Sequence, residues 1–344
     1  MKGNRLATAA ITLMAAALFL ALLNWGAHLF FGPYGRRLLI AWGINSLLAV
    51  SLNLVNGQTG QFSLGHAGFM AVGAYASALL AISQPEGFGP FLGDTGSYLW
   101  ILALFLAAGS AAALVGVLVA IPIFRLRGDY LAIATLGFGE MIFVIVLNLP
   151  ATGGARGLGG IPEHTTVLVA FGALLVGVVI VKNLVGSRFG RAFASIREDE
   201  TAAEAVGINT TKYKVLAFTV AAFLAGVAGS LYAHHQVFMV PHSFRFMKSV
   251  EIVIMCILGG SGSITGAILG AGVLTMLPEW LRLQERFRLK VDPRMVIFSA
   301  LLVVLMLVRR QGLLGNRELS FSSLRAAIKK LGKNTLDRKG IADA

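Results

Sequence analysis

Long runs of apolar residues, separated by short polar segments, dominate the chain. A helix needs roughly 20 apolar residues to cross a membrane, and most of the runs approach or exceed this length. Residues 249–260 are too few for an ordinary crossing and suggest a broken or re-entrant helix. We therefore expect an all-α polytopic membrane protein with about ten (eight to ten) transmembrane helices. The runs are residues 9–31, 38–56, 66–82, 99–122, 130–149, 165–183, 215–234, 249–260, 263–281 and 293–308.

The composition excludes a soluble globular fold of this size. Of the 344 residues, 56% are hydrophobic and 13% are charged, and the mean hydropathy is +0.78. The formal net charge is +13, but the basic residues lie between apolar runs and at the C-terminus. This placement indicates membrane topology and contact with anionic lipid rather than nucleic acid. The single cysteine, Cys256, excludes an intrachain disulfide.

The distribution of Lys and Arg predicts that both termini are cytoplasmic. This orientation puts Arg125 and residues 185–213 inside, and it leaves residues 83–97, which contain no basic residue, outside. Arg36 and Arg37 would also lie outside, although Lys and Arg are expected mainly in cytoplasmic loops. A second basic group would lie outside as well. That group comprises Arg282, Arg286, Arg288 and Lys290.

The C-terminal residues form a basic tail. Residues 309–344 hold nine Lys or Arg against three acids, and we separate them from a transmembrane permease domain over residues 1–308. Two readings of the tail stay open: a solvated disordered segment, or an interfacial helix on an anionic leaflet. The second reading rests on the helical spacing of Phe321, Leu324, Ile328 and Leu331.

The longest charged segment between two apolar runs is residues 185–213. Its alanines favour helix, the acidic run 198–200 favours a helix N-terminus, and Gly207 fits a position just past a helix end that needs positive φ. We expect a structured helix-loop-helix that offers a cytoplasmic surface to a soluble partner.

Two glycine-rich stretches, residues 56–73 and 258–272, each follow an apolar run. Glycine at this density would break or tightly bend a helix, which is tolerated at membrane depth only where the backbone is buried or lines a cavity. One stretch in each half is the pattern of an internally repeated transporter with discontinuous helices. Close packing of helices through small residues explains the glycines equally well.

Glu140 lies near the middle of an apolar run, where an ionisable side chain is costly. Two readings stay open. Glu140 acts in the translocation pathway or its gating, or it is a protonated acid that only stabilises helix packing. The partners expected for it are Asn148, Asn53 or the backbone near Gly137. The sequence contains no phosphate-binding loop, paired Cys-x-x-Cys or His-Glu-x-x-His, so we expect neither ATP hydrolysis nor a resident metal.

Five motifs together resemble the LivM-type permeases of bacterial branched-chain amino acid ABC importers. The resemblance covers roughly residues 38–310 and is absent from both chain ends. The motifs lie in the family's order at residues 53–75 (NLVNGQTGQFSLGHAGFMAVGAY), 129–140 (DYLAIATLGFGE), 157–162 (GLGGIP), 190–218 (GRAFASIREDETAAEAVGINTTKYKVLAF) and 251–271 (EIVIMCILGGSGSITGAILGA).

The resemblance implies that residues 196–207 form the coupling helix that docks on an ATPase. The residues assigned to it are Ile196, Arg197, Glu198, Asp199, Glu200, Ala203, Glu204 and Gly207. The residues assigned to the translocation pathway, together with Glu140, are Gly57, Gly60, Ser63, Gly65, Gly68, Gly259, Gly260, Gly262 and Gly266.

The resemblance also implies an inner-membrane protein that is not an enzyme and holds no cofactor, because ATP binds to partner subunits. Those partners would be a second, LivH-type permease, two ATP-binding subunits and a periplasmic binding protein that delivers leucine, isoleucine or valine. Two alternatives stay open. One is an importer of urea or short-chain amides, and the other is an ion-coupled secondary transporter that uses Glu140 as its coupling carboxylate.

Overall fold

The computed structural model describes residues 32–84, 89–126, 128–280 and 312–315. Within these ranges the regular structure is helical, apart from one isolated antiparallel bridge between Leu158 and Met239. The longer helices are α2 (Pro33–Asn53), α3 (His66–Ser83), α4 (Gly89–Ile123), α5 (Asp129–Asn148), α6 (Val167–Val185), α7 (Arg188–Glu198), α8 (Glu200–Ala205), α9 (Thr210–Gln236), α10 (Phe246–Gly259) and α11 (Ile264–Trp280). The short ones are the π-helix η1 (Leu54–Gln58) and the 3-10 turns η2 (Pro150–Thr152), η3 (Gly154–Arg156) and η4 (Pro241–Phe244).

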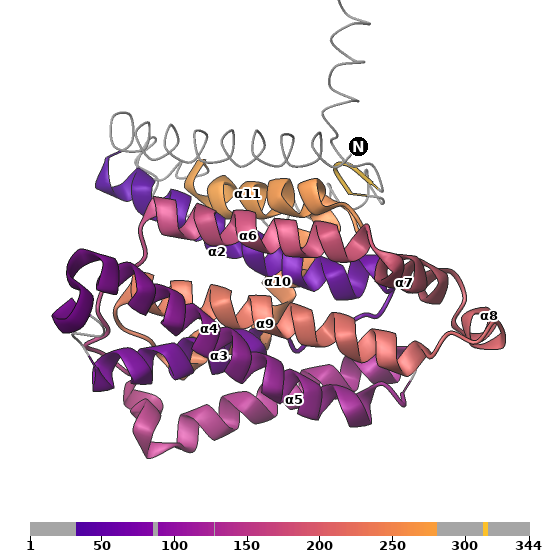
Figure 1. Cartoon of the computed structure of the whole chain (residues 1–344), viewed down its shortest axis with the longest axis horizontal. Helices are drawn as coiled ribbons and strands as arrows, with labels where there is room; N and C mark the ends of the chain where they lie inside the picture. Colours follow the sequence, from indigo (N-terminus) through magenta and orange to yellow (C-terminus); the bar gives the residue numbers. More distant parts are fainter. Residues whose placement is uncertain (1–31, 85–88, 127, 281–311, 316–344) are drawn as a thin grey trace, which may run out of the picture.

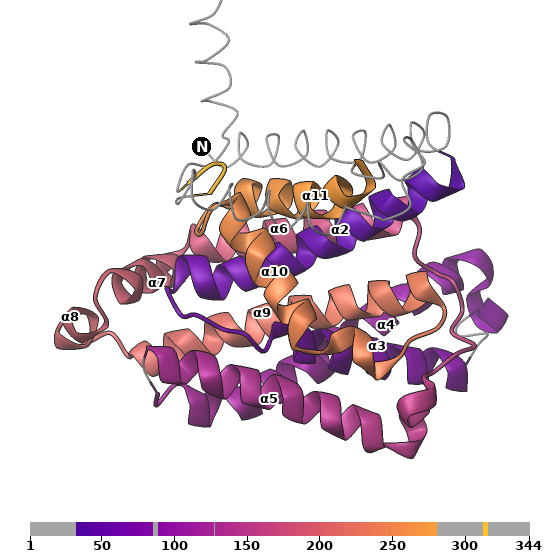
Figure 2. The same ribbon diagram turned by 180° about the vertical axis from the view of Figure 1, so that it is seen from behind.

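The helices form two layers, which Figure 1 and Figure 2 show from opposite sides. One layer contains α2, α6 and α11, and the other contains α3, α4, α5 and α9. α10 runs steeply between them and contacts α2 and α11 on one side and α3 on the other. α7 and α8 project from one end of the molecule, whereas α2 begins at the opposite end.

α9 lies at the centre of the packing, against α2, α3 and α4. Small residues let the neighbouring backbones come close. A Cβ added at Gly226 would lie 2.6 Å from Ala112 Cβ of α4, so a larger residue does not fit there. Phe218 of α9 makes edge-on ring contacts with Phe69 at 5.2 Å and Phe124 at 5.3 Å. These contacts fill one continuous apolar core.

Six helices in the described ranges are long and apolar enough to cross a membrane, and each matches a run predicted from the sequence. They are Pro33–Gln58, His66–Ser83, Tyr98–Ile123, Asp129–Asn148, Val167–Val185 and Thr210–Gln236. The predicted runs 249–260 and 263–281 correspond to α10, with 14 residues, and α11, with 17 residues up to the edge of the described range. The predicted runs 9–31 and 293–308 lie outside the described residues.

Both glycine-rich stretches interrupt helices, as the sequence predicted. α2 ends in the π-helix η1, the chain then runs without helix through residues 59–65, and α3 begins at His66. The second break is a turn between α10 and α11 that contains Gly260 with φ +118° and Gly262 with φ +97°. Such conformations are rarely open to residues with a Cβ, which accounts for glycine at these two positions.

Part of the segment predicted as a basic tail packs on the helices. Leu313 N donates to Leu258 O at 2.8 Å and Leu314 N donates to Gly259 O at 3.2 Å. These bonds satisfy two carbonyls at the end of α10 that have no partner within the helix. Residues 312–315 therefore belong to the packed body, and the rest of the predicted tail lies outside the described residues.

Candidate coupling surface and glycine-rich junction

The polar segment between α6 and α9 folds into two helices rather than one. α7 and α8 meet at Asp199, whose backbone is extended with φ −158° and ψ 115°. Asp199 Oδ1 accepts a hydrogen bond from Ala202 N at 2.9 Å and so caps α8. These two helices agree with the helix-loop-helix expected for residues 185–213, whereas the single coupling helix assigned to residues 196–207 from the resemblance is interrupted at Asp199, whose side chain starts a new helix. Gly207 has φ +84°, the positive value predicted from the sequence.

Two of the acids predicted to dock on an ATPase are engaged within the chain. Glu200 Oε1 lies 2.6 Å from Lys214 Nζ, and the Lys214 side chain is fully buried. Glu204 Oε1 accepts a hydrogen bond from Thr210 Oγ1 at 2.8 Å. Both contacts join α8 to the first turn of α9. Glu200 and Glu204 therefore hold α8 against α9.

The outward surface of α7 and α8 carries exposed acids, namely Glu198, Asp199 and Glu204, and an apolar tip. The side chain of Glu198 is 76% exposed and Val206 is 77% exposed. Ile196 and Ala203 are buried and anchor the two helices from beneath. Val206 was not among the residues that the sequence assigned to this surface. We define the coupling surface as Glu198, Thr201, Ala202, Ala205 and Val206, all exposed.

Arg197 links this surface to the bend that follows α2. Its Nη1 donates to Gly57 O at 3.3 Å, while its Nη2 donates to Glu198 Oε1 at 3.1 Å. Gly60 lies against the same residue, since a Cβ at Gly60 would be 3.0 Å from Arg197 Cγ. The end of α7 therefore rests on the first glycine-rich stretch. The sequence placed Arg197 among the docking charges and did not predict this inward contact.

The two glycine-rich stretches, far apart in the sequence, meet directly. Asn53 Oδ1 accepts from Gly262 N at 2.8 Å, and Asn53 Nδ2 donates to Ser263 O at 2.9 Å. Gln58 Nε2 adds a bond to Gly262 O at 2.6 Å. A Cβ at Gly57 would lie 2.9 Å from Gly262 Cα and would overlap Asn53 Oδ1. We call this contact between η1 and the α10–α11 turn the glycine junction.

The other residues predicted for the pathway pack against neighbouring backbone. Gly65 lies against Thr135 and Gly68 against Gly139, both in α5, and Gly259 and Gly266 lie against one another across α10 and α11. Gly260 lies against Gly315, since a Cβ there would be 2.6 Å from Gly315 O. Ser63 is buried, and its N–H donates to Asn56 Oδ1 at 3.2 Å. In this conformation these residues serve close helix packing, which is one of the two readings that the sequence left open.

Glu140 joins α5 to the start of α10. Its Oε1 accepts a hydrogen bond from Phe246 N at 2.9 Å, the first residue of α10, where a carboxylate is favoured by the free N–H groups of the helix end. Two of the predicted partners bond elsewhere: Asn148 donates to Val144 O within α5, and Asn53 belongs to the glycine junction. The contact was not predictable from the sequence because it joins residues 106 positions apart.

Two pockets open at opposite ends of the molecule. One, of about 650 Å³, lies between the starts of α7 and α9. The other, of about 260 Å³, lies where α2 and α6 begin and α9 ends, and its lining includes Arg36, Arg37, Glu163 and His235. Arg36 and Arg37 belong to the start of α2, which lies at the end opposite α7 and α8. In the described part of the chain, no group of three or more His, Cys, Asp or Glu could hold a metal ion.

Comparison with known proteins shows to which family the chain belongs. The family model described as branched-chain amino acid transport system / permease component matches residues 36–308. The high-affinity branched-chain amino acid transport system permease protein LivM of Salmonella typhimurium is 34% identical over 303 residues, covering 78% of this chain and 67% of the relative. The probable LivM permease of Methanocaldococcus jannaschii is 27% identical over 268 residues, covering 68% and 77%.

The LivH permease of Salmonella typhimurium is also similar, with 27% identity over 295 residues, covering 79% of this chain and 92% of the relative. No solved structure matches the chain significantly. The family match spans the glycine junction, the coupling surface and, apart from residues 33–35, all six candidate membrane-crossing helices. The chain is therefore a multi-pass membrane protein that belongs to the permease component family of branched-chain amino acid transport systems.

Proposed function

We propose that the chain is the translocating permease of a binding-protein-dependent ABC importer that carries leucine, isoleucine or valine across the bacterial inner membrane. Family membership supports the substrate class, since LivM relatives are named for branched-chain amino acid transport. Similarity to both LivM and LivH supports pairing with a second, related permease. Two ATP-binding subunits and a periplasmic binding protein complete the proposed assembly.

One observation carries the proposal: the exposed coupling surface is joined on its inner side to the glycine junction through Arg197. In this scheme, α7 and α8 dock on an ATPase at the cytoplasmic face. Movement of the ATPase shifts the end of α7, and Arg197 passes the shift to Gly57. The shift then reaches the α10–α11 turn through the contact of Gly57 and Asn53 with Gly262.

Both sides of the glycine junction lie at breaks in helices, where the backbone changes direction without unfolding a whole helix. In many transporters broken helices form the substrate site, and one helix bundle rocks against the other around it. The rearrangement opens the pathway alternately to each side of the membrane, and ATP binding biases the two states. The chain itself supplies the gate, and the partner subunits supply the energy.

Charge reversal at Glu198 tests the docking step. Glu198→Lys places a cation at an exposed part of the coupling surface. We expect ATP-driven leucine uptake by the assembled transporter to fall about 5- to 30-fold, which corresponds to a loss of about 1–2 kcal/mol in the free energy of docking on the ATPase. Glu198 is the better choice than Glu200 because its side chain is 76% exposed and its partner Arg197 is at the surface, whereas Glu200 pairs with the fully buried Lys214.

The matched control is Asp129→Lys, which reverses an exposed carboxylate at the start of α5 and leaves the coupling surface intact. Uptake by the control is expected to stay within about twofold of the wild type, since surface changes away from a contact are small. Full uptake by Glu198→Lys, with normal recovery of the ATPases on purification, would contradict docking at this surface.

Import of urea or short-chain amides is the second candidate, because selectivity in such systems rests largely with the delivering protein. Competition of labelled leucine uptake by urea distinguishes the two, and our proposal predicts no competition. An ion-coupled carrier is disfavoured by the position of Glu140, whose carboxylate is committed to the N-terminus of α10.

A further inference from the structure

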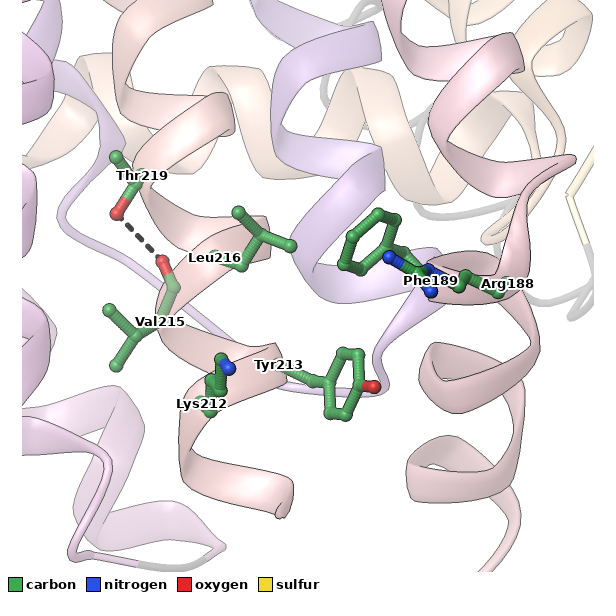
Figure 3. A pocket seen from close by; sticks show the side chains of 7 residues that line it. All are labelled: Arg188, Phe189, Lys212, Tyr213, Val215, Leu216 and Thr219. Atoms are coloured by element: carbon green, nitrogen blue, oxygen red, sulfur yellow. Dashed lines mark hydrogen bonds between the residues drawn. The ribbon is translucent and has the colours of Figure 1, made fainter. Parts of the chain in front are cut away.

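The larger pocket lies at the base of the projecting helices and is shown in Figure 3. α7 contributes Arg188 and Phe189, and α9 contributes the remaining lining residues. Phe189 and Leu216 point toward one another across the opening. The full lining is Arg188, Phe189, Lys212, Tyr213, Val215, Leu216 and Thr219.

The charged groups that line the pocket are both cations. Arg188 and Lys212 are exposed, and neither has an ion-pair partner among the described residues. The guanidinium carbon of Arg188 lies 5.4 Å from the centre of the Phe189 ring, so the arginine is held over the aromatic face at the mouth. No carboxylate is among the lining residues. The mouth therefore favours an anion.

The floor of the pocket is apolar and follows a helix that can cross the membrane. Val215, Leu216 and Thr219 occupy successive turns of α9, which belongs to the candidate spans. Thr219 Oγ1 donates to Val215 O at 2.7 Å, as the dashed line in Figure 3 shows, so its hydroxyl is satisfied. Phe189 and Tyr213, 6.1 Å apart, lie between the cations and this floor, the placement of aromatic side chains at a membrane interface.

We propose that this pocket binds one anionic phospholipid. The headgroup phosphate lies between Arg188 and Lys212, and an acyl chain follows Val215, Leu216 and Thr219 along α9. Lipid fits better than a soluble protein because the lining changes from cationic to aromatic to apolar along the axis of a membrane-crossing helix. A soluble partner would meet the cations but not the floor.

Native mass spectrometry of the purified full-length chain tests this, with phosphatidylglycerol and phosphatidylethanolamine as paired probes. We expect the wild type to retain phosphatidylglycerol preferentially. The double variant Arg188→Gln/Lys212→Gln is expected to lose about tenfold or more of that binding, given the contribution of each cation near an anionic headgroup. Leu216→Trp, which fills the floor and keeps both cations, is expected to lower binding as well.

The control double variant is Lys182→Gln/Arg191→Gln, which removes two exposed cations of α6 and α7 that do not line the pocket. It is expected to bind lipid like the wild type. Equal losses in the two double variants would overturn the proposal, because they would show unspecific attraction. Unchanged binding by the pocket variants would overturn it too, as would displacement of the lipid by inorganic phosphate.

Discussion

Gly57 is the residue at which α2, α7 and the α10–α11 turn come together. Its carbonyl accepts a hydrogen bond from Arg197, and its Cα faces Gly262 and the amide of Asn53. The sequence placed Gly57 in a stretch expected to break or bend a helix, and the resemblance assigned it to the pathway, but neither could show what lies opposite. That depends on Gly262, more than 200 positions away in the chain.

Gly57→Ala should destabilise the permease. The added methyl would overlap Asn53 Oδ1 and lie 2.9 Å from Gly262 Cα, and both neighbours are held by hydrogen bonds. We expect a loss of about 1–3 kcal/mol in the free energy of unfolding, as overpacking commonly causes. Thermal denaturation in detergent measures it. Gly137→Ala is the control, because nothing lies within 4 Å of a Cβ at that position. Equal thermal denaturation midpoints for Gly57→Ala and Gly137→Ala would show that the glycine junction has room for a methyl group.

Glu140→Gln separates a structural role from ion coupling. Glutamine keeps a side-chain oxygen that can accept from Phe246 N but cannot carry a coupling charge. We expect uptake within about twofold of the wild type, whereas Glu140→Leu leaves the N–H of Phe246 without this acceptor and should lower stability by about 1–3 kcal/mol. If Glu140→Gln abolished uptake without changing stability, the result would support ion coupling through the Glu140 carboxylate.

The membrane helices are the elements that the sequence predicts best. Apolar length alone located all six candidate spans and the two shorter helices α10 and α11, since burial in lipid requires such runs. The helix start within the acidic run 198–200 was predicted from the sequence, and the structure shows Asp199 as the N-cap of α8. The ion pair of Glu200 with Lys214 could not be predicted from the sequence, because it depends on how α8 folds back on α9.

α7 and η1 are the two elements whose contact transmits force in this account, and Arg197→Ala tests that contact. The variant removes a charge-assisted bond to Gly57 O, which is worth about 1.5–3 kcal/mol. We expect the ATPases to remain bound and to hydrolyse ATP, while the leucine moved per ATP falls several-fold.

Arg191→Ala is the matched control for Arg197→Ala, because Arg191 is an exposed arginine of the same helix. It should leave the ratio of transport to hydrolysis unchanged. Dissociation of the ATPases from Arg197→Ala would place the arginine in the docking contact instead of in transmission.

The described part of the molecule is a two-layer helical body with a pocket at each end. The coupling surface and the lipid pocket share one end, whereas the start of α2, with Arg36 and Arg37, lies at the other. The glycine junction lies between α2 and the α10–α11 turn and contacts α7 through Arg197. Such an arrangement lets a change at one end alter the packing of both layers, since α10 contacts helices of each.

Uptake by reconstituted vesicles tests the central claim most directly. Vesicles that contain this chain with its partner permease, ATPases and binding protein should accumulate labelled leucine only when ATP is supplied on the ATPase side. Vesicles that contain this chain alone should accumulate none under an imposed proton or sodium gradient. Gradient-driven accumulation by the chain alone would contradict the account.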